Sequence, residues 1–107
     1  MRIVTWNVNG IRAAIRKGFD KFVEKIDADI WMLQEVRCLP EQLPPKWAPP
    51  ADSEMILHPA EKKGYSGVST ISRVDMKEIG RGMKGSLDPE DSEGRVLVTQ
   101  HGDITLV

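Results

Sequence analysis

Residues 1–10 read MRIVTWNVNG, and this stretch decides how the rest of the chain is interpreted. The β-branched and aromatic side chains of residues 2–6 predict a buried, central strand that runs directly into two asparagines and a glycine. Residues 30–35, IWMLQE, repeat the arrangement, since an apolar strand again ends on an amide and a carboxylate. Two strands that each carry polar groups at their carboxyl ends predict one site at the edge of a sheet, where strands hold such groups rigidly.

The segment between these two strands has helical periodicity. Gly18 interrupts the pattern, so we expect a short helix, a break, and a second helix that ends near Asp27. This strand–helix–strand order favours two neighbouring strands covered by the intervening helices. The apolar positions that recur three or four residues apart are Ile11, Ala14, Ile15, Phe19, Phe22, Val23 and Ile26.

The remainder of the chain is predicted to form short strands separated by loops. Five of the seven prolines fall within residues 39–50, which predicts a surface loop with at most one turn of helix. We expect strands over residues 55–57, 67–72 and 75–79, then a loop over residues 80–94. Residues 95–100 and 103–107 are expected to form a hairpin that turns at His101 and Gly102. The expected fold class is α/β, with a mixed sheet and flanking helices.

Composition limits the class of protein. The 107 residues, 40% hydrophobic and with a net charge of −1, fit one globular domain that has no overall field toward nucleic acid or membrane. Any contact with nucleic acid must therefore come from a local patch. The single cysteine excludes an internal disulfide and fits a reducing compartment. Because no stretch resembles a signal peptide or a membrane span, the expected location is cytoplasmic.

Glu35 is the strongest candidate for chemistry. A carboxylate at the end of a strand suits Mg²⁺, which takes one or two protein carboxylates and leaves its other positions to water and phosphate. Asn7 and Asn9 follow the other strand, and their amides offer an oxygen to a metal or NH₂ donors to a phosphate. The plainer alternatives are a solvated glutamate and asparagines that only form the turn. We favour a shared site because neighbouring strands would bring both ends to one edge.

Residues 62–68, KKGYSGV, form a third candidate element. The lysines could neutralise phosphates, while an exposed Tyr65 could stack on a base or wedge beside a groove. The alternative is a solvated basic turn with Tyr65 packed on the core. Arg12 and Lys17 in the first helix, and Arg95 after a Glu-Gly pair, are open to the same choice between phosphate contact and ordinary surface charge.

The other reactive side chains belong to no motif. His58 precedes a proline in an expected loop, His101 occupies an expected turn, and Cys38 is interpreted as an ordinary semi-buried thiol. The sequence contains no zinc-ligand spacing, no phosphate-cradling glycine motif and no nucleophile elbow.

Four motifs together resemble one known family. They are WNVNGIRA at 6–13, DIWMLQE at 29–35, GYSGV at 64–68, and EGR at 93–95 followed by a strand. Their order and spacing are similar to those of the exodeoxyribonuclease III family of abasic-site endonucleases, over the whole chain. The wider endonuclease/exonuclease/phosphatase superfamily is built as a two-sheet α/β sandwich with its site at one end of the sheets. The resemblance implies that this chain is the N-terminal portion of such a sandwich.

The resemblance also implies roles for single residues. Glu35 would match the metal-binding glutamate of the family, and Asn7 the asparagine that lines the metal and phosphate site. The implied DNA contacts come from Asn9, Arg12, Lys17, Gly64, Tyr65 and Arg95. The implied reaction is hydrolysis, assisted by Mg²⁺ or Mn²⁺, of a phosphodiester 5′ to an abasic site in duplex DNA, with trimming of 3′ ends.

Two features depart from the family pattern. Arg37 stands where a lysine is usual. The family's later tyrosine, aspartate-x-asparagine pair, further aspartate and near-terminal aspartate–histidine pair have no counterpart here, and the apolar residues 104–107 have nothing after them to cover the edge. Since general bases and transition-state contacts each contribute orders of magnitude, we expect an incomplete, essentially inactive chain when it is alone.

Two alternatives remain open at the level of sequence. One is a phosphodiesterase of the same superfamily that acts on a lipid or small-molecule phosphate. The other is a non-catalytic truncated or split half that docks with a missing C-terminal half through its open edge. Preference for abasic duplex over lipid headgroups would exclude the first, and cooperative unfolding of a soluble monomer would argue against the second.

Overall fold

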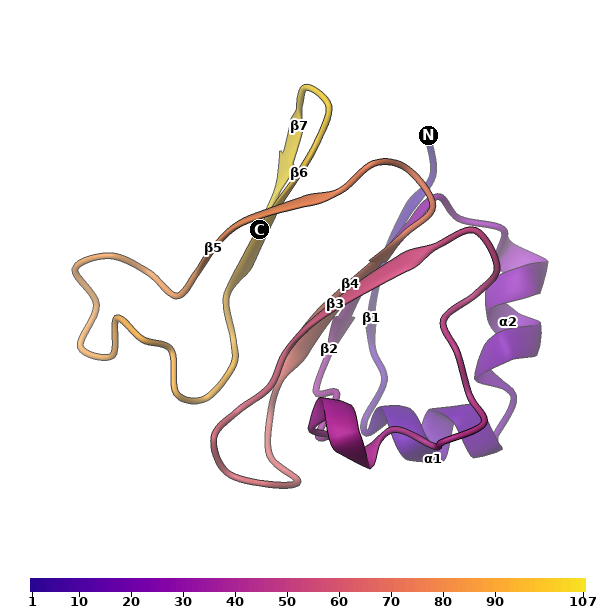
Figure 1. Ribbon diagram of the computed structural model, residues 1–107, viewed down its shortest axis with the longest axis horizontal. Helices are drawn as coiled ribbons and strands as arrows, with labels where there is room; N and C mark the ends of the chain where they lie inside the picture. The colour runs from indigo at the N-terminus through magenta and orange to yellow at the C-terminus, as the bar shows by residue number, and fades with distance from the viewer.

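In the computed structural model, residues 1–107 form two β-sheets and two short α-helices (Figure 1). The first sheet has the spatial order β1 (Ile3–Asn7), β2 (Ile30–Gln34), β4 (Val68–Ser72) and β3 (Glu54–His58). The second sheet contains β5 (Lys77–Arg81), β6 (Leu97–His101) and β7 (Ile104–Leu106). Helices α1 (Ile11–Arg16) and α2 (Phe19–Ile26) join β1 to β2, and a 3-10 helix η1 (Pro40–Gln42) lies in the proline-rich loop. The expected α/β class with two sheets is confirmed.

The first sheet is mixed. Strand β1 runs parallel to β2 with Asn7 opposite Gln34, whereas β4 is antiparallel to both β2 and β3. Because β1 and β2 are parallel neighbours, their carboxyl ends lie at the same edge of the sheet, as predicted. Within residues 1–107, however, β1 lies at the edge of this sheet, beside β2 alone, whereas the sequence predicted a central strand. Ile3 is 40% exposed, which shows that a β-branched side chain need not report burial on both faces.

The main core lies between the first sheet and the helices. Gly18, with φ of +108°, separates the two helices where the break was predicted, and this left-handed backbone suits glycine. Phe19 is only 1% exposed and stacks on Trp6, with ring centroids 5.4 Å apart. Trp31, 2% exposed, packs beside them, so this tryptophan is a core residue. The core fixes how α1 and the loop before it sit over the ends of β1 and β2.

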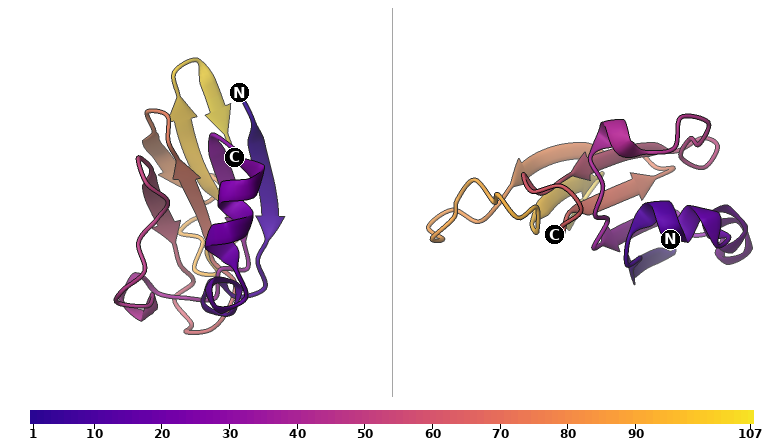
Figure 2. Two further views of the ribbon diagram at one scale, coloured as in Figure 1. Left: turned by 90° about the vertical axis from the view of Figure 1, so that its right-hand side faces the viewer. Right: turned by 90° about the horizontal axis from the view of Figure 1, so that it is seen from below.

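The second sheet packs on β4, on the side away from the helices (Figure 2). A buried polar pair crosses this contact, since His101 Nδ1 of β6 lies 3.4 Å from Ser72 Oγ of β4. Within β6, His101 Nε2 lies 2.9 Å from Thr99 Oγ1. Burial lowers the pKa of His101 below its ordinary value, so the imidazole is neutral between the sheets near neutral pH.

Two predicted boundaries in the second sheet are wrong. Strand β5 covers residues 77–81, two positions later than expected. The hairpin turns at Gly102 and Asp103, because His101 is the last residue of β6 and pairs with Ile104. Gly102 has φ of +61°, a conformation that glycine supplies at no steric cost.

No helix of the chain is both long and apolar enough to cross a membrane.

Candidate functional site at the carboxyl ends of β1 and β2

Backbone hydrogen bonds extend the pairing of β1 and β2 beyond the strands. The N–H groups of Val8, Gly10 and Ile11 donate to the carbonyls of residues 34, 35 and 36 at 3.0, 2.8 and 3.0 Å. On the other side, the N–H groups of residues 36 and 37 donate to the carbonyls of residues 67 and 66, at 3.0 and 2.7 Å. Residues 7–11, 34–37 and 65–68 are therefore tied together at one edge, so all three predicted elements meet there.

Left-handed backbone is concentrated at this edge. Asn9, Glu35, Arg37 and Ser66 have φ of 48°, 50°, 54° and 45°, although none is a glycine. Each such residue costs roughly 1–2 kcal/mol, and it persists only where the surrounding structure enforces it. At Asn9 the enforcement is visible, since its N–H donates to Asn7 Oδ1 at 3.0 Å. Backbone strain of this kind tends to cluster at functional sites.

Two side chains hold the Glu35 carboxylate. Asn7 Nδ2 donates to one carboxylate oxygen, and Arg37 Nη2 donates to the other at 2.6 Å. The side chains of Glu35 and Arg37 are 39% and 43% exposed, so the pair faces solvent. The bond from Asn7, then that from Arg37, lowers the pKa of Glu35 below its ordinary value. Glu35 is therefore a fixed, ionised carboxylate at the strand ends.

The bonding pattern also fixes the orientation of the Asn7 amide. An ionised carboxylate only accepts hydrogen bonds, so the NH₂ group of Asn7 must face Glu35, and its oxygen faces the Asn9 N–H. The structure thus brings Asn7 and Glu35 together, as predicted, with Asn7 acting as a donor that orients Glu35. Direct ligation of a metal by Asn7 stays a prediction.

The donor set fits a cation that keeps most of its own water. The chain has no cluster of three or more His, Cys, Asp or Glu side chains that could form a protein cage around a metal. Mg²⁺ does not need such a cage, because one or two carboxylates suffice when water and phosphate complete its shell. Glu35 offers one carboxylate of this kind, open to solvent at the edge.

Tyr65 and Arg95 lie beside one another near this carboxylate. Tyr65 is 42% exposed, with the Lys62 ammonium 5.5 Å and the Arg95 guanidinium 5.9 Å from its ring centroid. Gly64, before Tyr65, has φ of +73°. The charge of Arg95 also contributes to lowering the pKa of Glu35. Arg95 also forms a surface ion pair with Glu93 at 2.8 Å, as one of the two interpretations from the sequence expected, whereas contact with a DNA phosphate stays a prediction.

The two cations predicted to contact DNA in this part of the chain, Arg12 within α1 and Lys17 directly after it, lie differently. Arg12 is half-buried and donates to the carbonyl of Arg37 at 3.3 Å, which places it beneath the Glu35 segment. Lys17 is exposed at the end of α1, where it lines a cleft of about 320 Å³ together with Asn9. The structure therefore brings Arg12 to the site and puts Lys17 and Asn9 in an adjoining cleft. DNA contact by these residues stays a prediction.

Sequence reasoning missed one buried hydrogen-bonded pair close to this region. His58 is the last residue of β3 rather than a loop residue, and its Nε2 lies 2.9 Å from Asp91 Oδ2. Asp91 was not singled out at all, because it lies in a predicted loop. The available signal was its position four residues before Arg95, with a histidine ending an apolar strand.

Comparisons with known proteins agree with the fold. A sequence model of the Endonuclease/Exonuclease/phosphatase family matches residues 4–105. The solved 3′-5′ exonuclease NExo from Neisseria meningitidis has the same fold, with a TM-score of 0.81 at 23% identity over 98% of this chain and 39% of that one. The chain belongs to the endonuclease/exonuclease/phosphatase family, whose members generally use divalent metal ions.

Two relatives are nearer in sequence. The chain is 33% identical over 109 residues to the DNA repair nuclease APEX1 of Danio rerio, covering 100% of this chain and 34% of that protein. It is 33% identical over 105 residues to the exodeoxyribonuclease of Bacillus subtilis, covering 97% of this chain and 40% of that protein. The chain thus spans well under half of the length of these curated relatives.

Proposed function

We propose that this chain is part of a DNA-repair nuclease that hydrolyses phosphodiester bonds at abasic sites and 3′ ends of duplex DNA. The observation that carries the proposal is the ionised Glu35, held by Asn7 and Arg37, with Tyr65 and Arg95 beside it. The names of the two relatives at 33% identity, a DNA repair nuclease and an exodeoxyribonuclease, support DNA as the substrate. The cytoplasm is the proposed location.

Glu35 is the proposed ligand of Mg²⁺, or of Mn²⁺ in its place. Such a cation, when bound, supplies polarisation of the phosphate and stabilisation of the leaving oxygen. Asn7 keeps the Glu35 carboxylate aimed at the edge, and it offers its amide to the same phosphate region. Arg37 neutralises Glu35 in the absence of a cation, so a bound cation competes with the Arg37 guanidinium for that carboxylate.

The DNA backbone is proposed to cross the surface formed by Tyr65, Arg95 and the start of α1. Cations that contact phosphates release counterions, which gives binding without a large net charge on the chain. Tyr65, exposed between two cations, suits a wedge into the minor groove. Further contacts with the same DNA strand are proposed for Arg12, Lys17, Asn9 and the Gly64 backbone.

Competitive binding tests the substrate class. The chain is titrated, with Mg²⁺, against a duplex carrying one abasic-site analogue, the undamaged duplex, and phosphatidylserine vesicles. We expect preference for the abasic duplex and a loss of affinity in Arg95→Ala. Lys25→Ala serves as the control, because Lys25 is an exposed cation in the last turn of α2. A preference for vesicles would contradict the proposal and favour a phosphodiesterase that acts on a lipid phosphate.

A nicking assay tests activity. Wild type and Glu35→Gln are incubated with the abasic duplex and Mg²⁺, and we expect neither 107-residue chain to nick it. Nicking by wild type that Glu35→Gln abolishes would confirm the nuclease but refute the expected inactivity of this chain alone. Equal nicking by both proteins would refute the role assigned to Glu35.

A further inference from the structure

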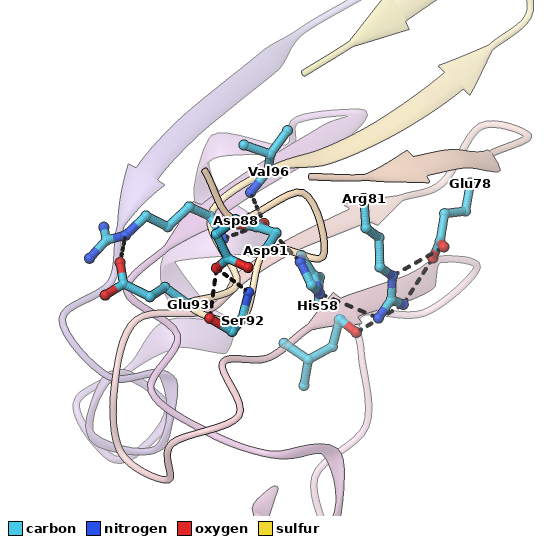
Figure 3. Close-up of polar contacts among 10 residues, drawn as sticks. His58, Glu78, Arg81, Asp88, Asp91, Ser92, Glu93 and Val96 are labelled. Atoms are coloured by element: carbon cyan, nitrogen blue, oxygen red, sulfur yellow. Dashed lines mark hydrogen bonds and ion pairs between the residues drawn. The ribbon is translucent and has the colours of Figure 1, made fainter. Parts of the chain in front are cut away.

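The turn formed by residues 91–95 is docked against the backbone of residues 58–61, and we call this contact the 58–61/91–95 junction. At its centre the side chains of His58 and Asp91 are only 7% and 11% exposed, with Nε2 and Oδ2 2.9 Å apart (Figure 3). The backbone adds a second link, since the Glu61 N–H donates to the Ser92 carbonyl at 2.8 Å. The proposed chemistry at Glu35 uses neither His58 nor Asp91.

Asp91 collects three hydrogen bonds on a single oxygen. Its Oδ2 accepts from His58 Nε2 and from the backbone N–H groups of Arg95 and Val96, at 2.8 and 2.6 Å for the latter two. Burial acts to raise the pKa of Asp91, but the bonds from Val96, Arg95 and His58 outweigh it, so the pKa lies below its ordinary value. An ionised Asp91 requires His58 Nε2 to be the donor, which leaves Nδ1 facing Arg81 Nη1 at 3.4 Å.

Gly94 shows how closely the two segments approach. Its φ is +61°, and a Cβ at this position would lie 2.7 Å from Ala60 N and 2.7 Å from Pro59 C. Those neighbours are backbone atoms, which have little freedom to move aside. The 91–95 turn therefore sits in one place relative to residues 58–61, with no room for a side chain between them.

Both halves of the junction lead directly to the proposed DNA surface. Residues 58–61 continue into the segment that carries Lys62 and Tyr65, and the 91–94 turn ends at Arg95. The Arg95 guanidinium lies 5.9 Å from the Tyr65 ring centroid, although 30 residues separate these two side chains in the sequence. The junction sets this distance, because it is where the two segments are fastened together.

We propose that Asp91, held by His58, is a positioning residue that fixes the Arg95 guanidinium beside Tyr65 for contact with a DNA phosphate. Asp91 acts through the Arg95 backbone and does not itself touch DNA. The contact of Arg95 with DNA rests on the proposed nuclease function, whereas the positioning of Arg95 by Asp91 does not.

The sign of the expected effect separates this proposal from simple electrostatics. Asp91 is an anion, so its removal by charge alone would strengthen binding to a polyanion. If Asp91 positions Arg95, its removal weakens binding instead. Glu90 provides the matched control, because it is the neighbouring acidic residue and its side chain is exposed.

The binding experiment is a double-mutant cycle on the abasic duplex. Asp91→Ala and Arg95→Ala are each expected to weaken binding by roughly fivefold to tenfold, and the double variant to bind no more weakly than Arg95→Ala. Both single variants should lower the slope of log affinity against log salt by about 0.9, the value for one lost phosphate contact. Glu90→Ala should bind as wild type or slightly tighter. Asp91→Asn keeps an acceptor oxygen for the two N–H groups and should recover most of the affinity.

A ligand-free measurement keeps the proposal testable if DNA binding fails. The Arg95 side-chain NMR shifts report the Tyr65 ring, and Asp91→Ala should move them while Glu90→Ala should not. If these shifts move but the wild-type chain does not bind DNA, the positioning stands and the proposed function fails. Arg95 shifts that do not move in Asp91→Ala would overturn the positioning. So would affinity losses from Asp91→Ala and Arg95→Ala that multiply in the double variant. Circular dichroism verifies folding. If Asp91→Ala does not fold, His58→Ala replaces it in the NMR measurement, because it removes the side-chain hydrogen bond that holds Asp91 and should also move the Arg95 shifts.

Discussion

Replacing Gly94 with alanine tests the close contact on which the junction depends. Gly94 and Gly102 both have φ of +61°, but they differ in surroundings. A Cβ on Gly94 would meet three backbone atoms of residues 58–60 at 2.7 to 2.8 Å, whereas a Cβ on Gly102 would meet nothing within 4 Å. Gly102→Ala is therefore a control in which the conformational cost is the same and the steric cost is absent.

The magnitude follows from these two terms. Placing alanine in a left-handed conformation costs roughly 1–2 kcal/mol, and this is the expected loss of unfolding free energy for Gly102→Ala. Forcing an extra carbon into a closely packed site costs about 1–3 kcal/mol more, which applies to Gly94→Ala alone. For a domain of this size each kcal/mol lowers Tm by roughly 4–8 °C, so the two variants should differ by several degrees at least.

The assay is urea unfolding followed by tryptophan fluorescence, with thermal melting as a second measure. Gly94→Ala should unfold at a clearly lower urea concentration than Gly102→Ala, without a change in the slope of the transition. Gly94→Ala should also move the Arg95 side-chain NMR shifts, which Gly102→Ala should leave in place. Equal destabilisation by the two substitutions would refute the close approach of the 91–95 turn to residues 58–60.

Three further predictions follow from the core, the inter-sheet contact and the site. Phe19→Ala should lower the unfolding free energy by about 3–5 kcal/mol, because it empties a buried aromatic site; a loss below about 1 kcal/mol in urea unfolding would contradict its central packing. The pKa of His101 is lower in the folded chain than in the unfolded chain, so the unfolded chain binds the proton first as the pH falls. The free energy of unfolding should therefore be highest above pH 6.5 and decline as the pH falls below that value. His101→Asn should remove that decline from urea unfolding measured between about pH 7.5 and about pH 5.5, and an unchanged decline would show that another group causes it. Asn7→Ala should raise the pKa of Glu35 toward 4.5, and by more than Arg37→Ala does, in an NMR titration of the Glu35 carboxylate; the reverse order would mean that Arg37 is the main partner.

The fold was predictable where local chemistry decides it. Apolar runs that end in polar residues located β1 and β2, and the helical spacing with a glycine at position 18 located both helices and their break. The edge position of β1 was not predictable in this way, because the exposure of Ile3 depends on which strand lies beside it. The end of β6 was misplaced because His101 resembles a polar turn residue, whereas it is buried between the sheets and faces Ser72 of β4.

The site residues were also predictable only where local sequence places them. Asn7 and Glu35 could be paired from the sequence, since both follow strands that a short helical crossover makes parallel neighbours. Arg37 was noted only as a departure from a family pattern, although it holds one oxygen of Glu35. The His58–Asp91 pair could not be found from local patterns, because its members are 33 residues apart and only the packing of the 91–95 turn on β3 brings them together.

Glu35 is the group at the strand ends that we propose binds a divalent cation. Paramagnetic broadening by Mn²⁺ tests this in the 107-residue chain, with or without catalytic activity. We expect low Mn²⁺ concentrations to broaden the Asn7 side-chain amide and the backbone signals of residues 34–37 in wild type, and Glu35→Gln to abolish the effect. Broadening that survives in Glu35→Gln, or that first affects the carboxylates of Asp27 and Asp29 at the opposite end of β2, would contradict it.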